Sequence, residues 1–555
     1  MWIKNNYGTI EEMMEKRNLT VPKSYSFIRN VKEAANLCKK CIRAGMDITI
    51  VGDYDCDGIT STSILYESIM EYVNLLGTKN DVTYIIPNRY TEGYGLNVSI
   101  VDRITSGLMI TVDNGISAVE QLERAKEKGL FTIVIDHHLV RDDGKIPNVN
   151  VLVDPHQDDS VFKDYCGAGL AYRFALELHP QTTKEAEFLS LAAIGTIADV
   201  MPLVGDNRKI VIGGLKNIAE RKVLPGLNRL LDVLQIDEYV NEDTIGFKIG
   251  PCFNALGRMR GEGGREMVDV ITSHPMNPEE DQKLTELANE VVQTNKDRQE
   301  LVLKEMALVN DSLKDIDPVI VFEDSTMFTK GTIGIVAGRL TEKYKRPAVV
   351  FTTDTKNSNN FSGSGRAPEG VHLKNLLDKA GAIAEKEGIK LFCGYGGHAG
   401  AAGLTIPKEN LPVFQRIMNT LMKDYKASAE DFHYDLDCTA PNVPALYEKI
   451  KKYAPYGEGN PAPVVRINNL SGIPKIIGEF RNHFKIQGPA ITVLGFEMVE
   501  EWNAQDQPTS MDVIGTLGVN RFKDMDYYQI RILDFQKIEE TKTDLYSSLE
   551  ELFSF

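Results

Sequence analysis

The stretch Ile48-Thr49-Ile50-Val51-Gly52-Asp53-Tyr54-Asp55-Cys56-Asp57-Gly58 joins a short apolar run to three closely spaced carboxylates. Residues 48–51 predict a buried β-strand, and residues 59–76 predict a helix that Gly77 ends. Aspartate and glycine are ordinary turn residues, so this stretch alone also fits a polar turn. The alternation of strand and helix nevertheless favours an α/β fold.

The same pattern recurs further along the chain. Residues 108–112 and 131–135 predict two more strands, separated by a helix-like stretch at 117–128. Asp113 follows the first of these strands, and Asp136-His137-His138 follows the second. Parallel strands present their carboxyl ends at one edge of a sheet, so these acidic turns are expected to converge there.

Asp199 adds a further carboxylate, between the helix-like run 188–198 and Val200-Met201-Pro202. Carboxylates that are crowded together raise one another's pKa, and those that stay ionised at neutral pH usually share a cation. A divalent metal is the simplest such cation. The sequence therefore predicts a metal site at the edge of the sheet.

The remaining patterns suggest several domains. A long amphipathic helix is expected at 278–313. It is followed by a second α/β region, with strands at 319–322 and 348–351 and a helix at 332–344. The short β-like runs after it, which end at 527–533, suggest a small β-barrel. A terminal helix is the favoured interpretation of the last stretch, over a docking peptide. The predicted boundaries are an N-terminal extension at 1–45, a first domain at 46–276, a connecting helix at 277–315, a second domain at 316–427, a β-domain at 428–540 and a tail at 541–555.

Composition limits the classes of function. A chain of 555 residues with 42% hydrophobic and 25% charged residues is too long for one core, and two to four domains are expected. Without a secretion signal or an apolar run that could cross a bilayer, we expect a cytoplasmic protein and no membrane. The net charge of −17 argues against coating nucleic acid through a general positive field. Seven scattered cysteines indicate a reducing compartment, and the pair Cys38 and Cys41 is assigned no function.

Taken together, the four acidic motifs resemble those of the DHH phosphoesterases in order and spacing. Further segments, over residues 45–540, resemble the RecJ branch of that superfamily: GPCFNALGR at 250–258, GIVA at 334–337, GSGR at 363–366, GGHAGAAG at 396–403 and YGEGNP at 456–461. The resemblance implies a parallel-sheet DHH domain, a DHH-associated second domain and a C-terminal OB-fold barrel.

The resemblance also implies roles for single residues. The expected metal ligands are Asp53, Asp55, Asp57, Asp113, His137 and Asp199. Asp53 and Asp136 either bind a metal ion directly or hydrogen-bond to a residue that does. Mixed carboxylate and imidazole ligation suits two Mn²⁺ ions, with Mg²⁺ as a substitute. Asp113 would bridge the ions, which activate water, while His138 faces the scissile phosphate; the predicted catalytic residues are Asp113, Asp136 and His138.

Substrate contacts are implied in the same way. The residues expected to bind DNA phosphates are Arg89, Asn254, Arg258, Ser364, Arg366, Gly397 and His398. In the β-domain, the candidates for binding single strands are Arg481, Lys485, Arg521 and Tyr528. Each of these, taken alone, is also compatible with an ordinary surface residue.

Two departures from the RecJ pattern concern residues that the resemblance relates to DNA binding. Cys252 stands where an arginine is usual, and a Trp-His pair is missing before the segment Phe328-Thr329-Lys330-Gly331. Neither departure touches the predicted metal site.

The resemblance implies a 5′-to-3′ exonuclease that releases 5′-mononucleotides from single-stranded DNA in repair and recombination. The alternatives are a DHH phosphodiesterase for oligonucleotides or cyclic dinucleotides, a pyrophosphatase, and a non-catalytic scaffold in a replication complex. Single-stranded DNA is the expected binding partner, and a single-strand-binding protein or a helicase is a candidate protein partner. The chain is expected to be a monomer.

Overall fold

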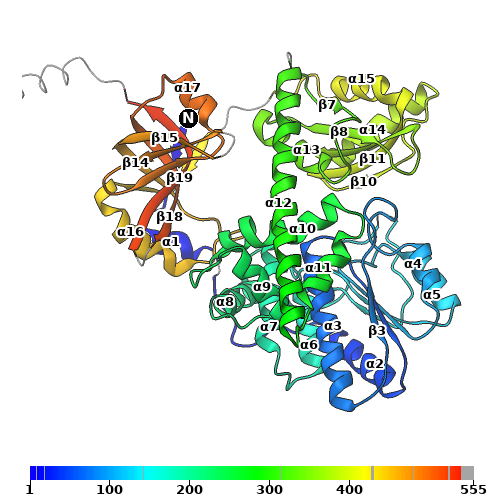
Figure 1. Ribbon diagram of the computed structural model, residues 1–555. Helices are drawn as coiled ribbons and strands as arrows, with labels where there is room; N and C mark the ends of the chain where they lie inside the picture. The colour runs from blue at the N-terminus through cyan, green and yellow to red at the C-terminus, as the bar shows by residue number, and fades with distance from the viewer. Residues whose placement is uncertain are drawn as a thin grey trace, which may run out of the picture. The chain divides into compact units, whose positions relative to one another are not determined.

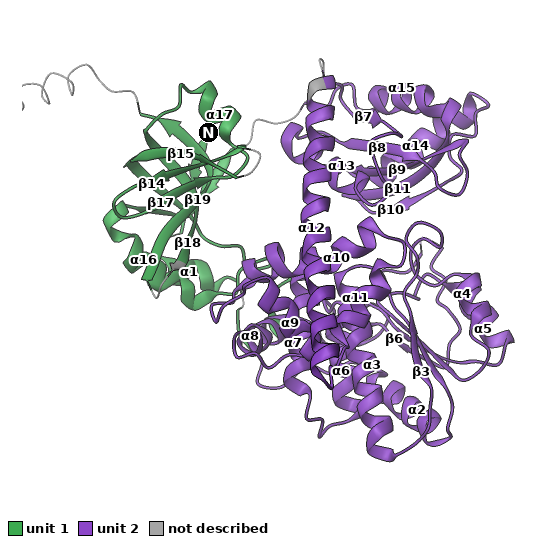
Figure 2. Cartoon of the chain, viewed as in Figure 1, with its two compact units in different colours: residues 1–21, 202–205, 429–555 green, residues 22–201, 206–428 purple. Residues whose placement is uncertain are grey.

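The computed structural model describes the chain except residues 8, 18, 142, 314–315, 427–430, 479–480, 523–524 and 539–555, together with the side chains of 311, 521 and 522. The chain divides into two compact units, and Figure 2 colours each separately. Unit 1 comprises residues 1–21, 202–205 and 429–555, and unit 2 comprises residues 22–201 and 206–428. The predicted terminal helix in the tail lies outside the described residues.

Unit 2 contains a five-stranded parallel sheet with the strand order β3-β2-β4-β5-β6. Its strands are β2 (Ile48–Val51), β3 (Val82–Ile85), β4 (Leu108–Val112), β5 (Phe131–Ile135) and β6 (Val151–Val153). Val51, Met109 and Val134 pack against the helices on one face, α4 (Val98–Arg103) and α5 (Val119–Glu127). This confirms the predicted parallel α/β architecture.

Further helices complete this part of unit 2, and Figure 1 shows α2 and α3 on the side of the sheet opposite α4 and α5. They are α2 (Val31–Arg43), α3 (Cys56–Leu76), η1 (Pro155–Gln157), α6 (Gly167–Leu178), α7 (Glu185–Ala198), α8 (Gly205–Ala219), α9 (Pro225–Val233), η2 (Thr244–Ile249), α10 (Gly250–Met259) and α11 (Gly263–Ile271). Helix α3 begins three residues before the predicted start, because the Asp55 side chain accepts a hydrogen bond from Gly58 N at 3.0 Å and caps it.

The long helix α12 (Pro278–Ser312) contacts α9, α10 and α13, and it continues to a second sheet (Figure 1). That five-stranded mixed sheet has the order β10-β11-β9-β8-β7. Its elements are β7 (Ile320–Glu323), α13 (Ile333–Tyr344), β8 (Ala348–Thr353), β9 (Asn360–Arg366), α14 (Leu373–Lys386), β10 (Gly394–Gly397), β11 (Ala401–Pro407), η3 (Lys408–Asn410) and α15 (Leu411–Leu421). The predicted connecting helix and second α/β region are therefore confirmed.

Unit 1 is built on a seven-stranded sheet with the order β13-β14-β18-β19-β17-β16-β15, and on a short parallel pairing of β1 with β12. Its elements are β1 (Trp2–Lys4), α1 (Ile10–Glu15), β12 (Phe432–Tyr434), β13 (Leu436–Cys438), η4 (Ala440–Asn442), α16 (Val443–Ile450), η5 (Lys451–Tyr453), β14 (Val464–Ser471), β15 (Ile473–Ile477), β16 (His483–Gln487), β17 (Thr492–Gly495), α17 (Val499–Ala504), β18 (Ser510–Phe522) and β19 (Met525–Lys537). Segment 1–45, predicted as one extension, thus contributes to both units.

Two further observations concern the cysteine pair and the length of the helices. Cys38 and Cys41 are both buried in α2, and burial raises the pKa of both thiols, so neither is activated for redox chemistry. Among the described residues, each helix is too short or too polar to span a lipid bilayer.

Candidate metal centre and phosphate site

Three adjacent strands of the parallel sheet each lead into a buried aspartate. Asp53 follows β2 after one glycine, while Asp113 and Asp136 directly follow β4 and β5. Since β2, β4 and β5 are neighbours and parallel, the three residues share one edge of the sheet. Their exposed fractions are 1%, 3% and 1%, so ionised carboxylates there need a partner that replaces water.

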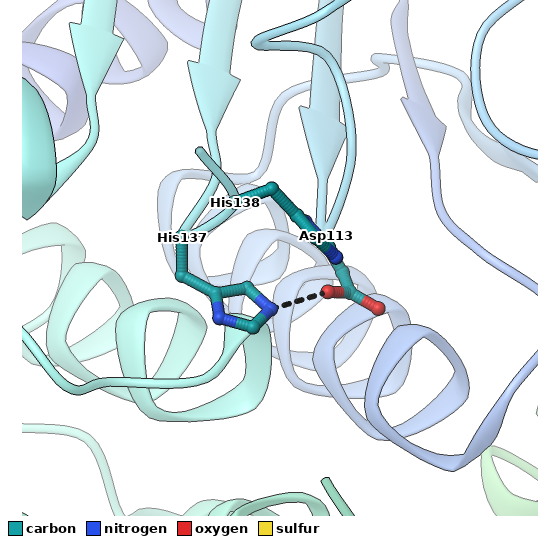
Figure 3. A group of neighbouring side chains, drawn as sticks. All are labelled: Asp113, His137 and His138. Atoms are coloured by element: carbon teal, nitrogen blue, oxygen red, sulfur yellow. Dashed lines mark hydrogen bonds and ion pairs between the residues drawn. The ribbon is translucent and has the colours of Figure 1, made fainter. Parts of the chain in front are cut away.

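His137 lies at the centre of the acidic cluster. Its Nε2 atom is 3.0 Å from Asp113 Oδ1, and Figure 3 shows the two side chains pointing toward one another. The same nitrogen lies 3.7 Å from Asp57 Oδ2 and 3.7 Å from Asp199 Oδ2. Residues separated by more than 140 positions in the sequence therefore meet around one imidazole.

The potential ligand atoms form three overlapping groups, in each of which the atoms lie within 4.8 Å of one another. Asp113 and His137 each belong to two groups, so the groups share residues. The groups are Asp113 with His137 and His138, Asp57 with His137 and Asp199, and Asp53 with Asp55 and Asp113. All six predicted ligands are thus brought together, and His138 joins them.

Asp57 is held rigidly by the start of helix α6. Its Oδ2 accepts a hydrogen bond from Gly167 N at 2.6 Å, and its Oδ1 accepts one from Ala168 N at 2.9 Å. A Cβ atom at Gly167 would lie 2.6 Å from Asp113 Cβ, and one at Gly195 would lie 2.6 Å from Asp57 Oδ1. Glycine at these two positions is therefore required for the helices to approach the cluster.

Each of these carboxylates makes the ionisation of its neighbours less favourable. Burial, and then Asp57, Asp55 and Asp53, raise the pKa of Asp113 well above its usual range. Burial and Asp55 do the same to the pKa of Asp53, whose Oδ1 atom is buried without a hydrogen-bond partner. Burial, Asp57 and Asp55 raise the pKa of Asp199 to about 8. Such a donor set fits divalent cations, which would compensate the excess negative charge.

Asp136 has a different part in this arrangement, because it holds a histidine. Its Oδ1 lies 2.8 Å from His138 Nδ1, and its Oδ2 accepts a hydrogen bond from Ile116 N at 2.8 Å. Burial lowers the pKa of His138, but the hydrogen bond and charge of Asp136 outweigh it and raise that pKa to about 9. Conversely, burial raises the pKa of Asp136, but His138 lowers it overall. The two side chains form an ion pair that orients the imidazole.

Tyr94 belongs to the site but was not singled out from the sequence. Its hydroxyl oxygen lies 3.3 Å from His138 Nε2 and donates a hydrogen bond to the Asp113 carbonyl at 3.3 Å. It lies in the segment PNRYTEGYG at 87–95, where the resemblance implies a role only for Arg89. A tyrosine in a glycine-containing loop has no periodicity that would have marked it.

Three of the predicted phosphate-binding residues are arginines without a carboxylate partner within 4.0 Å among the described residues. Arg258 Nη1 donates to Gly331 O at 3.2 Å, Arg366 Nη1 donates to Ser364 Oγ at 3.2 Å, and the Arg89 guanidinium carbon lies 4.8 Å from the Tyr54 ring centroid. Burial, followed by the charges of Arg89 and Arg298, lowers the pKa of Arg258 to about 9. This group is therefore suited to bind an anion.

The other predicted substrate residues lie elsewhere or have a different contact. Asn254 Oδ1 accepts a hydrogen bond from Cys56 N at 3.0 Å and thereby supports the acidic turn. Gly397, with φ 144°, is the exposed last residue of β10, and His398 is exposed in the turn that follows, where its N donates to Ala401 O at 2.8 Å. Within the described part of the chain, His398 has no contact with the acidic cluster or the arginines.

Cys252, the first departure from the RecJ pattern, is buried, and so is Phe328, which begins the segment that the missing Trp-His pair would precede. Cys252 is 0% exposed, and its Sγ contacts Asn295 Nδ2 of α12 at 3.6 Å. Phe328 is 4% exposed and packs against Phe322 with ring centroids 5.7 Å apart. Cys252 therefore packs between α10 and α12, and Phe328 belongs to the apolar cluster formed with α12 and α13.

The candidates in unit 1 are spread over several strands. Arg481 is exposed just before β16, Lys485 is half-buried in β16 opposite Lys475, and Tyr528 packs edge-on against Tyr447 at 5.8 Å. Arg521 lies in β18, and its side chain is outside the described residues. These positions remain predictions for single-strand binding.

Three protein-family models match the chain in the predicted order. The N-terminal domain of the DHH family matches residues 47–196, the DHHA1 domain matches 317–424 and the RecJ OB domain matches 434–534. The last match confirms that the sheet of unit 1 is an OB domain.

Relatives and solved structures agree with these matches. The chain is 32% identical to the single-stranded-DNA-specific exonuclease RecJ of Bacillus subtilis over 91% of its own length and 63% of that protein. It is 30% identical to the RecJ exonuclease of Haemophilus influenzae, over 82% of this chain and 80% of that one. RecJ of Thermus thermophilus, solved with Mn²⁺, superposes with a TM-score of 0.75 and 26% identity over 95% of this chain and 74% of that chain. By its acidic cluster, domain order and these similarities, the chain belongs to the RecJ family of DHH proteins.

Proposed function

We propose that this chain is a metal-dependent exonuclease that hydrolyses single-stranded DNA from the 5′ end and releases 5′-mononucleotides, in DNA repair and recombination. The observation that carries the proposal is the presence, in one unit, of an acidic cluster suited to divalent ions and of arginines that lack an anionic partner. A phosphodiester strand provides the missing anion, and the ions provide the means to cleave it.

The acidic cluster would hold two Mn²⁺ ions, with Mg²⁺ as a substitute. The proposed ligands are Asp53, Asp55, Asp57, Asp113, His137 and Asp199, and among them Asp113 and His137 each belong to two of the ligand groups. When bound, the ions activate water as the nucleophile and stabilise the leaving oxygen. Carboxylate-rich ligation with one imidazole is compatible with both metals.

The other side chains of the site would position the strand. His138, oriented by Asp136, and Tyr94, in contact with His138, line the position next to the cluster where the scissile phosphate would lie. Arg89, Arg258, Ser364 and Arg366 would bind the 5′-terminal phosphate, so that the first phosphodiester bond meets the acidic cluster.

A digestion assay tests the proposal. Single-stranded, blunt and 3′-tailed DNA are incubated with the chain and Mn²⁺, and the products are resolved as a ladder. We expect mononucleotides to be released from the 5′ end of single strands, no reaction in EDTA, and little digestion of blunt duplexes. Release from the 3′ end, or equal digestion of duplexes, would contradict the proposal.

The same assay separates the alternatives. Preferred hydrolysis of dinucleotides, cyclic dinucleotides or pyrophosphate would favour another DHH phosphodiesterase or a pyrophosphatase. Metal binding without turnover on any of these substrates would favour a scaffold. We further expect a monomer that acts in the cytoplasm, with a single-strand-binding protein or a helicase as possible protein partners.

A further inference from the structure

Arg298, on helix α12, is a fourth arginine near the phosphate site. Its Nε and Nη2 atoms both donate to Asn295 Oδ1, at 3.2 and 2.9 Å. Asn295 is 8% exposed, and its amide nitrogen contacts Cys252 Sγ on helix α10. A neutral amide, itself anchored to the neighbouring helix, therefore fixes the direction of the Arg298 guanidinium.

The charge of Arg298 is not compensated by an acidic side chain. Among the described residues, no carboxylate lies within 4.0 Å of its guanidinium, although the side chain is half-buried. Burial, and then the charge of Arg339, lower the pKa of Arg298. A guanidinium that is oriented in advance, partly desolvated and without a counter-ion is arranged to receive an anion.

The phosphate site consequently carries more positive charge than one terminal phosphate needs. Arg298 acts electrostatically on Arg258, which is also close to Arg89 and Arg366. The nearby carboxylate, Asp55, is assigned to the metal ions. A terminal monophosphate carries a charge of only about −1.5 to −2 at neutral pH, so four guanidinium groups match an end with a larger negative charge.

The first turn of helix α13 approaches these groups closely. The helix has 12 residues, and its second residue, Gly334, is close to the substrate-binding side chains of β9. A Cβ atom at Gly334 would lie 3.1 Å from Ser364 Oγ and 3.3 Å from Arg366 Nη2. Glycine at this position therefore lets the partly positive end of the helix lie directly beside Ser364 and Arg366.

We propose that this site accepts DNA strands with a 5′-triphosphate end, and that Arg298 contacts the phosphates beyond the one bound by Arg258 and Arg366. The inference rests on the proposed function, in which these arginines hold the 5′ end. Water then attacks the phosphorus that links the first two nucleotides, and the bond to the 3′ oxygen of the first nucleotide breaks. The products are a deoxynucleoside triphosphate with a free 3′ hydroxyl and a strand, shorter by one nucleotide, that begins with a 5′ phosphate.

The experiment compares three otherwise identical single strands, which carry a 5′ hydroxyl, a 5′ monophosphate or a 5′ triphosphate. The full chain is assayed with Mn²⁺, kcat/KM is measured for each strand, and mass spectrometry identifies the first product. We expect the triphosphate strand to react at least as efficiently as the monophosphate strand and to release a deoxynucleoside triphosphate first. Arg298→Gln is expected to reduce kcat/KM for the triphosphate strand about tenfold more than for the monophosphate strand.

Two further variants serve as controls. Lys296→Gln removes one charge from the exposed face of the same helix and should leave the ratio of the two strands unchanged. Arg298→Lys keeps the charge but loses the planar fork, so an intermediate ratio is expected. Activity on the 5′-hydroxyl strand and the melting temperature report on folding.

The possible failures are distinguishable. Equal losses on all strands with Arg298→Gln, or poor cleavage of the triphosphate strand by the unaltered chain, would overturn this inference alone. If a monophosphate gave no advantage over a hydroxyl in the unaltered chain, the assignment of the 5′-phosphate site in the proposed function would itself be wrong.

Discussion

At the scale of single residues, Asp113 has the most unusual combination of properties. It follows β4 with φ 60°, it belongs to two of the three ligand groups, and its carboxylate is 3.0 Å from His137. A left-handed backbone is tolerated by Asp and Asn far better than by most residues. The position therefore allows an isosteric substitution that changes charge without changing the backbone.

We predict that Asp113→Asn lowers the rate of metal-dependent hydrolysis about a thousandfold or more. The substitution removes a proposed metal ligand, and several kcal/mol of transition-state stabilisation are lost with it. The fold should persist, and the melting temperature without metal should rise or stay unchanged, since a mutually repelling carboxylate is removed. Rates and thermal melts with and without Mn²⁺ measure both effects. Asp102→Asn, at an exposed residue, is the control, and normal activity of the Asp113 variant would disprove the assignment.

At the scale of elements, the contact between α12 and α13 contains a buried carboxylate that the sequence did not reveal. Glu305 is 0% exposed, its Oε1 accepts a hydrogen bond from Thr332 Oγ1 at 2.7 Å, and its Oε2 is buried without a partner. Burial raises the pKa of Glu305 to about 7. The amphipathic pattern predicted helix α12 well, but not which polar residue would face α13, because that depends on how the two helices meet.

This carboxylate predicts a pH-dependent stability. The pKa of Glu305 is higher in the folded chain than in the unfolded one, so its ionisation increasingly destabilises the fold as pH rises from about 4.5 through about 7. Glu305→Gln should therefore gain stability relative to the unaltered chain at pH 8, by up to about 3 kcal/mol, and gain little at pH 4.5. Urea unfolding at several pH values measures the difference, and a gain that does not vary with pH would refute it.

At the scale of the whole molecule, the N-terminus is part of the C-terminal unit. Strand β1 pairs in parallel with β12, and Ile10, Met13 and Met14 pack with Ile450 in one cluster. Strand β1 has three residues, and its partner lies more than 400 positions away in the sequence. Neither local propensity nor hydrophobic periodicity can indicate such a pairing.

We predict that Met13→Ala destabilises unit 1 by about 2–5 kcal/mol, because it leaves a cavity at a side chain that is 1% exposed. Calorimetry should show a lower melting temperature for the transition of unit 1, while the transition of unit 2 stays where it was. Glu11→Ala, at an exposed position of the same helix, provides the control. A parallel shift of both transitions would show that the two units do not unfold separately.

The sequence by itself determined the alternation of strands and helices in both α/β regions, the long connecting helix, and the acidic residues at the strand ends. These features follow from local periodicity and from the rule that parallel strands end at one edge. Only the tertiary structure decided that Arg298 lies near Arg258, that Tyr94 contacts His138, and that residues 1–21 join unit 1. Such contacts depend on the packing of elements distant in the sequence, and neither the pattern nor the propensity of a single segment contains that information.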